Sequence, residues 1–88
     1  MRLQIYPILI TAQRLRHIQT QPGRGHITRE EIEEAAATAR IFKANAKSKP
    51  ADLIVFGRAL NGKKLVLYVK LIPSSKKYRS KLITARAR

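Results

Sequence analysis

The chain contains no cysteine and no tryptophan, and only five of its 88 residues are acidic. Without cysteine, disulfides, thiolate metal sites and thiol nucleophiles are excluded, which fits a reducing compartment. No apolar run reaches the roughly 20 residues that span a bilayer. The short apolar segment 1–10 is interrupted by Pro7 and is interpreted as a strand rather than a signal peptide. We therefore expect a cytoplasmic protein that does not associate with membranes.

The few carboxylates are unevenly distributed. Four of them lie within residues 30–34, and only Asp52 lies elsewhere. Nineteen Lys and Arg residues give a formal net charge of +14, so the rest of the chain is almost purely basic. This charge pattern favours a polyanion or an acidic protein as partner. The alternative is a solvated surface that only keeps the protein dispersed.

The length and the hydrophobic content of 44% predict one domain, residues 1–88, with a small core. Hydrophobic periodicity predicts seven elements. These are a strand at 3–10, helices at 11–19 and 27–40, a weak strand at 41–45, and strands at 51–59, 63–72 and 78–86. Basic loops are expected at 46–50 and 73–77. The order indicates an α+β fold: a small antiparallel sheet of four to five strands with two N-terminal helices packed on one face.

The second helix has the clearest start signal. Thr28 is placed as the N-cap, and Glu31 three residues later completes a capping box. The glutamates crowd the positive end of the helix dipole, with Arg40 at the negative end, so they are interpreted as capping groups rather than catalytic groups. A stripe of small residues is predicted to lie close against the sheet: Ile32, Ala35, Ala36 and Ala39.

The hairpin around Asn61-Gly62 has two possible registers. A two-residue turn would pair Arg58 with Leu65 and bury the guanidinium, at a cost of several kcal/mol. A three-residue loop with Gly62 in the left-handed region pairs Arg58 with Lys64, which costs up to about 1 kcal/mol. The second register is therefore predicted. It collects the aliphatic residues on one face and leaves aromatic rings among cations on the other: Ile54, Phe56, Arg58, Lys64, Val66, Tyr68 and Lys70.

Rings interleaved with cations are typical of surfaces that bind nucleic acid, because rings stack on bases and cations follow phosphates. The candidate nucleic-acid-binding residues are Lys64, Tyr68, Lys70 and Tyr78, together with Arg14 and Arg16 of the first predicted helix. The alternative is a face half covered by a helix, with lysine stems lying over apolar neighbours.

Among possible chemistries, the sequence favours RNA cleavage without a metal or other cofactor. A two-metal nuclease needs clustered carboxylates, and this chain has only one, Asp52, outside the start of the second helix, so that class is disfavoured. No phosphate-binding glycine loop is present either. In metal-free cleavage the 2′-OH attacks phosphorus while a side chain accepts its proton. His17 or His26 is a candidate for that role, and Arg58 and Arg86 are candidates for holding the phosphate. The alternative for each histidine is a solvated or capping side chain. The alternative for Arg58 and Arg86 is that they only add to the general positive charge.

Several motifs occur in a familiar order: Gly57-Arg58, Asn61-Gly62, and Ile83-Thr84-Ala85-Arg86 after a long apolar strand. Together with the segment 27–31, they resemble BrnT-type toxins, which are RelE-superfamily ribonucleases of bacterial toxin–antitoxin pairs. The resemblance implies a compact cytoplasmic ribonuclease that an acidic antitoxin neutralises, with Arg58 and Arg86 contacting phosphate. Gly25-His26 reverses the family's His-Gly order, and the family's tryptophan segment is absent. The basic residue that the family has at its His-Gly position therefore also has candidates in the first helix of this chain: His17, Arg14 and Arg16.

Three functions follow as hypotheses. The first is the toxin component of a toxin–antitoxin pair, a metal-independent endoribonuclease that cleaves mRNA. The second is a non-catalytic basic module that binds RNA or DNA with the same face. The third is a basic interaction subunit that binds an acidic protein.

Overall fold

The computed structural model describes residues 4–24, 26–44 and 51–88. Leu3, Gly25 and the predicted basic loop at 46–50 lie outside the described residues. The elements are β1 (Ile8–Leu9), α1 (Ala12–Gln19), α2 (Arg29–Thr38), β2 (Ile41–Ala44), β3 (Leu53–Arg58), β4 (Lys64–Leu71) and β5 (Ser80–Ala87). The predicted α+β fold is confirmed, with both helices preceding the four longer strands.

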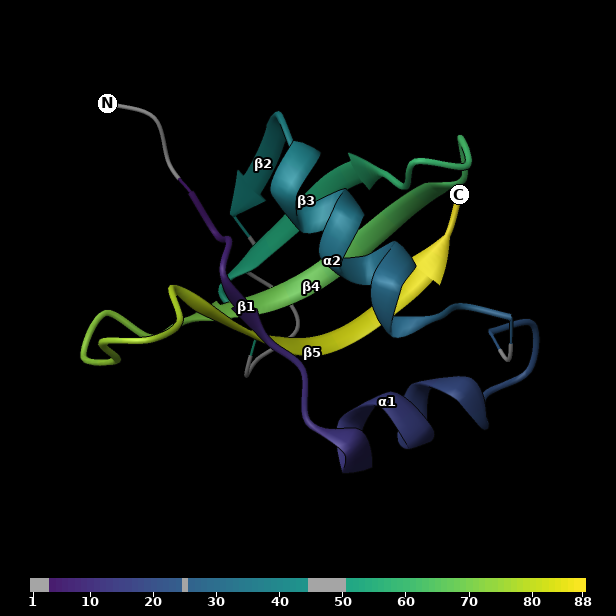
Figure 1. Ribbon diagram of the computed structural model, residues 1–88, viewed down its shortest axis with the longest axis horizontal. Helices are drawn as coiled ribbons and strands as arrows, with labels where there is room; N and C mark the ends of the chain where they lie inside the picture. The colour runs from purple at the N-terminus through teal and green to yellow at the C-terminus, as the bar shows by residue number, and fades with distance from the viewer. Residues whose placement is uncertain (1–3, 25, 45–50) are drawn as a thin grey trace.

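The five strands form one sheet in the order β1-β5-β4-β3-β2 (Figure 1). The pairs from β2 to β5 are antiparallel, as predicted, whereas the short β1 pairs with β5 in parallel, so the sheet is mostly antiparallel. The first strand is also much shorter than the predicted 3–10. Pro7 has no N–H to give to a sheet, and the chain leaves the edge after Leu9 to start α1.

The first helix is short and starts at a capping hydroxyl. The Oγ1 of Thr11 accepts a hydrogen bond from the backbone N–H of Arg14 at 3.1 Å. Ile18 is buried and Leu15 is half-buried, but Ala12 is exposed, so the apolar stripe is narrower than its spacing predicts. Ile18 enters the common core, and α1 lies alongside β5 (Figure 1).

The capping box of α2 is confirmed. The Thr28 Oγ1 accepts from the Glu31 N–H at 3.2 Å, and a Glu31 carboxylate oxygen accepts from the Thr28 N–H at 2.9 Å. The helix ends at Thr38, whose hydroxyl donates to the carbonyl of Arg58 in β3. Arg40 therefore lies beyond the helix and not at its negative end, and the last turn has no basic residue.

The core lies between the helices and one face of the sheet. Its largest fully buried side chains include Ile5, Ile18, Ile27, Ile32, Leu65, Leu67 and Leu82. The prediction that the α2 stripe lies close against the sheet is confirmed at Gly57 of β3. A Cβ at this position would lie 2.1 Å from the carbonyl oxygen of Ala35. The helix backbone can reach this depth only because β3 has no side chain there.

The predicted hairpin register is confirmed. Arg58 pairs with Lys64 and Val55 pairs with Leu67. The Ala59 N–H donates to the Lys63 carbonyl at 2.9 Å, which closes the three-residue loop, and Gly62 adopts φ +90°. The register places Val55, Leu65, Leu67 and Val69 in the core and turns Arg58 away from it.

Candidate nucleic-acid interface

The face of the sheet opposite the core is rich in cations, and we call it the cationic face. The strand register and the alternation of side chains assign its residues. They are Ile41 and Lys43 of β2, Ile54, Phe56 and Arg58 of β3, Lys64, Val66, Tyr68 and Lys70 of β4, and Lys81, Thr84 and Arg86 of β5. None of them is acidic. In the described part of the chain, both helices place their buried apolar side chains on the other face.

Four cations gather where β3 ends, β4 begins and β5 ends, and we call this group the arginine corner: Arg58, Lys64, Arg86 and Arg88. Arg58 pairs with Lys64, and the N–H of Arg88 donates to the Lys64 carbonyl at 2.9 Å, so three cations stand in one row across the strands. Arg86 lies in the next row, opposite Val66. All four side chains are exposed.

The corner brings together the two arginines that the sequence singled out. Arg58 and Arg86 lie two strand spacings apart and two residues out of line, which places their Cα atoms roughly 12 Å from each other. Within residues 4–24, 26–44 and 51–88, the one ion pair joins Lys63 to Glu31, and no cation of the corner takes part in it. Like charges on adjacent strands repel, so the corner is stabilised when an anion binds it.

The apolar middle of the cationic face is partly covered by its own neighbours. Val66 is buried, and Phe56 and Tyr68 are half-buried. The Arg88 guanidinium carbon lies 5.0 Å from the centroid of the Phe56 ring, a cation–π contact that occupies one side of that ring. Tyr68, opposite Thr84, is the remaining aromatic candidate for stacking on this face.

The other predicted site residues are distributed over the molecule. Lys70 pairs with Lys81 at the end of the face away from the corner. Tyr78 lies beyond that end, in the loop between β4 and β5. Arg14 and Arg16 lie on α1, beside β5, and are not part of the cationic face.

His17 is connected to the cationic face through two side chains. Arg24 donates both to Thr84 Oγ1, at 3.2 Å, and to Gln21 Oε1. The Gln21 Oε1 is therefore the atom that faces Arg24, which leaves the amide nitrogen directed at His17 Nε2, 3.4 Å away. Because an amide nitrogen can only donate, Nε2 of His17 is the acceptor in this contact.

His26 lies next to the hairpin loop. Its side chain is exposed, and its backbone carbonyl accepts from Lys63 Nζ at 3.3 Å. Lys63 also forms an ion pair with Glu31 Oε2, and the side-chain amide of Asn61 donates a hydrogen bond to the same oxygen at 2.8 Å. These bonds attach the loop between β3 and β4 to the start of α2, and they fix the end of the sheet where the arginine corner lies.

The electrostatics of Glu31 support its structural role. The hydrogen bond from Lys63 lowers the pKa of this buried carboxyl to about 2; the bonds from Asn61 and the Thr28 N–H act in the same direction, and burial opposes them. The interpretation of Glu31 as a capping group is consistent with this arrangement.

The described residues contain no group of three or more His, Cys, Asp or Glu side chains arranged to hold a metal ion.

The sequence did not single out Arg88 or Arg24, nor Lys43 and Lys81 of the cationic face. Arg88 joins the corner through the alignment of β4 with β5, which contains a bulge between Tyr68 and Val69. Arg24 reaches Thr84 across 60 residues of sequence. A signal for Arg88 exists in the sequence, because Arg88 follows Arg86 by two residues and strand alternation places the two on the same face.

Neither helix of the described chain has the length and apolar character that crossing a bilayer requires. Comparison of the chain with protein-family models, with curated proteins and with solved structures finds no match.

Proposed function

We propose that the protein binds single-stranded RNA along the cationic face and cleaves it without a metal at the arginine corner. The observation that carries the proposal is the collection of four exposed cations at one end of a face that has no acidic residue. A phosphodiester chain lying along this face neutralises the repulsion among them. Tyr68 supplies a ring for stacking, and Lys70 and Lys81 continue the charge towards the far end.

The proposed reaction uses the RNA's own nucleophile. The 2′ oxygen attacks the adjacent phosphorus while a base accepts its proton, and the bond from phosphorus to the 5′ oxygen breaks. The products are a 2′,3′-cyclic phosphate and a 5′-OH that receives a proton from an acid. Arg58 and Arg86 hold the phosphoryl oxygens, where negative charge develops, and each guanidinium can donate two parallel hydrogen bonds.

His17 and His26 are the candidates for moving the protons. His17 Nε2 faces the side-chain amide of Gln21, and in the proposed mechanism this nitrogen accepts the proton once Gln21 moves aside. His26 lies beside the loop that precedes Lys64. Replacing the catalytic histidine by alanine is expected to lower the cleavage rate by about 10²- to 10⁴-fold with little change in RNA affinity.

The central test compares cleavage of a labelled RNA by the wild type, Arg58→Ala and Arg86→Ala in the presence of EDTA. The wild type is expected to cleave and both variants to lose cleavage while their circular dichroism spectra stay unchanged. Arg40→Ala is the matched control, because Arg40 is exposed and lies outside the cationic face. Cleavage by both corner variants at the wild-type rate would refute the proposal.

A second candidate function is binding of RNA or DNA without cleavage. One observation favours it: the contacts from His17 reach the cationic face at Thr84, in the row beside Arg86, and not at an arginine of the corner. This candidate predicts salt-dependent binding with intact RNA after prolonged incubation. Recovery of uncut RNA from a complex whose affinity falls in Arg58→Ala and Arg86→Ala would support it over the ribonuclease.

The biological setting proposed for the ribonuclease is the bacterial cytoplasm, as the toxin of a toxin–antitoxin pair. The motif order around Gly57-Arg58 and Arg86 supports this proposal, and an acidic antitoxin suits the charge of +14. Induced expression in a bacterial host is expected to arrest growth with decay of mRNA, and the Arg58→Ala, Arg86→Ala double variant is expected not to. If arrest occurs with intact RNA, the basic surface acts on an acidic protein instead, as an interaction subunit.

A further inference from the structure

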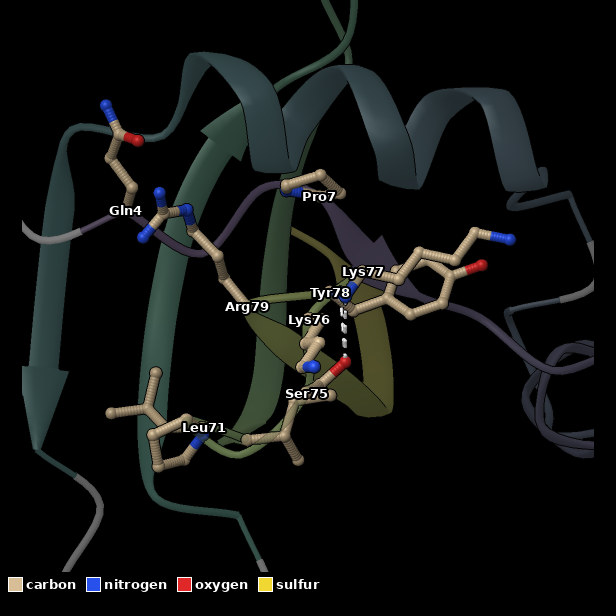
Figure 2. Close-up of a pocket in the computed structure, with 10 residues that line it drawn as sticks. Gln4, Pro7, Leu71, Ser75, Lys76, Lys77, Tyr78 and Arg79 are labelled. Atoms are coloured by element: carbon tan, nitrogen blue, oxygen red, sulfur yellow. Dashed lines mark hydrogen bonds between the residues drawn. The ribbon is translucent and has the colours of Figure 1, made fainter.

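A second feature of the molecule lies at the end of the sheet away from the arginine corner. It is a cavity of about 530 Å³, within the size range of small-molecule sites. Three segments line it: the chain before β1, the end of β4 and the loop between β4 and β5 (Figure 2). The eight residues of β4 separate it from the corner by roughly 26 Å.

The wall of this cavity combines an apolar surface with positive charge. Its apolar part consists of Pro7, Leu71, Ile72 and Pro73, and its cations are Lys76, Lys77 and Arg79. The remaining lining residues are Gln4, Ser75 and Tyr78, so none of the ten is acidic. A surface of this kind fits a ligand with a flat apolar ring and an anionic group.

The loop that forms the cavity is held by hydrogen bonds. The Ser75 Oγ accepts from the backbone N–H groups of Lys77, at 3.3 Å, and Tyr78, at 3.1 Å. The Ile72 N–H donates to the Arg79 carbonyl at 3.1 Å, and the Arg79 N–H donates to the Pro7 carbonyl at 2.8 Å. The loop is thereby tied to β4 and to the segment before β1, so the cavity is formed before a ligand binds and less ordering is required on binding.

The charged and aromatic groups lie on two sides of the cavity. Figure 2 shows the Arg79 side chain extending towards Gln4, with Lys77 and Tyr78 on the opposite side and Lys76 between them. The Lys77 ammonium lies 5.4 Å from the centroid of the Tyr78 ring, a cation–π contact that holds the two side chains together.

We propose that this cavity binds a nucleotide, with the phosphate against Arg79 and Lys76 and the base against Leu71, Pro73 and Tyr78. The guanidinium of Arg79 supplies the fork geometry that a phosphate accepts, and the apolar wall excludes water from the base. The site is separate from the arginine corner and does not require cleavage there. The nucleotide has two possible sources: a free nucleotide, or one unit of an RNA strand whose other units lie on the cationic face.

The test uses 5′-AMP and a short oligouridine with the full chain, followed by amide shifts in NMR spectra and by titration calorimetry. AMP is expected to shift the amides of 72–79, and Arg79→Gln and Lys76→Gln are each expected to weaken its binding roughly tenfold. Both side chains are exposed, and the Arg79 bond to Pro7 uses the backbone, so the variants keep the contacts that hold the loop. Arg40→Gln is the matched control, because Arg40 is exposed and lies outside both the cationic face and the cavity. Adenosine without phosphate is expected to bind more weakly than AMP.

Each outcome has a defined meaning. AMP binding that falls in Arg79→Gln but not in Arg40→Gln supports a site for free nucleotides. No binding of AMP, with oligouridine affinity that falls in Arg79→Gln, supports a site for one unit of a longer strand. If neither ligand is affected by Arg79→Gln, or if AMP shifts amides at the corner as strongly as in 72–79, the inference is wrong. Loss of cleavage or binding in corner variants tests the proposed function separately.

Discussion

The ammonium of Lys63 lies 2.7 Å from a carboxylate oxygen of Glu31, and this ion pair joins the loop between β3 and β4 to the first turn of α2. The same carboxylate accepts from Asn61 and from the Thr28 N–H. One side chain therefore caps a helix and fixes the hairpin that begins at Arg58 and ends at Lys64. This contact lies at the end of the sheet that carries the arginine corner.

Acid is expected to weaken the fold through Glu31. Its pKa falls from 4.5 to about 2 on folding, so its contribution to the free energy of unfolding is complete above pH 4.5 and is lost as the pH falls towards about 2. Urea unfolding of the wild type is expected to show this decline. Glu31→Gln is expected to be less stable by about 1 to 3 kcal/mol at neutral pH and to show a smaller decline.

The control for that experiment is Glu33→Gln on the same helix. Glu33 is not part of the contact with Lys63, so this variant should keep the pH dependence of the wild type. A wild-type decline that persists undiminished in Glu31→Gln would assign the acid sensitivity to other groups.

Adding a methyl group at Gly57 is expected to destabilise the protein strongly. The new Cβ would lie 2.1 Å from the Ala35 carbonyl oxygen, and backbone atoms cannot move aside without separating α2 from the sheet. We expect a loss of about 3 kcal/mol or more in urea unfolding of Gly57→Ala. Gly62→Ala is the comparison: it meets no atom within 4 Å, but φ of +90° is unfavourable for alanine, so about 1 kcal/mol is expected. Equal losses in the two variants would contradict the close approach of α2.

Neutralising the middle cation of the corner is expected to stabilise the free protein. Lys64 has Arg58 opposite on one side and Arg88 on the other, so Lys64→Gln removes repulsion worth about 0.2 to 1 kcal/mol at low salt. Thermal unfolding in low salt should show the gain, and roughly 1 M salt should abolish it. Lys43→Gln, opposite the neutral Ile54, should gain less. If Lys64→Gln also weakens RNA binding, the corner exchanges stability for function.

The salt dependence of RNA affinity is expected to distinguish the cationic face from the first helix. A log–log plot of affinity against salt should lose about 0.7 from its slope for each phosphate contact removed from a single strand. Arg86→Ala is expected to show this change. Arg16→Ala, on α1 and outside the face, is expected to leave the slope unchanged. Equal changes in both variants would indicate diffuse attraction by the net charge rather than a defined path for the strand.

The local rules of the sequence determined much of this fold. Thr28 and Glu31 specify the start of α2, because an N-cap and its reciprocal partner are only three residues apart. The register of the β3–β4 hairpin follows from the cost of burying Arg58, and this places Arg58, Lys64, Tyr68 and Lys70 on the face away from the core. In each case the deciding energies act between residues close in sequence.

The tertiary structure decided what depends on distant segments. The parallel pairing of β1 with β5 joins residues more than 70 positions apart. The bulge between Tyr68 and Val69 determines which residues of β5 lie on the same face as the cations of β4. The corner position of Arg86 and Arg88, the bond of Arg24 to Thr84 and the cavity around Arg79 all follow from those pairings. The sequence could specify that cations face away from the core, because alternation is a local property. Only the assembled sheet decides which cations become neighbours, because that depends on the free energy of packing the whole core.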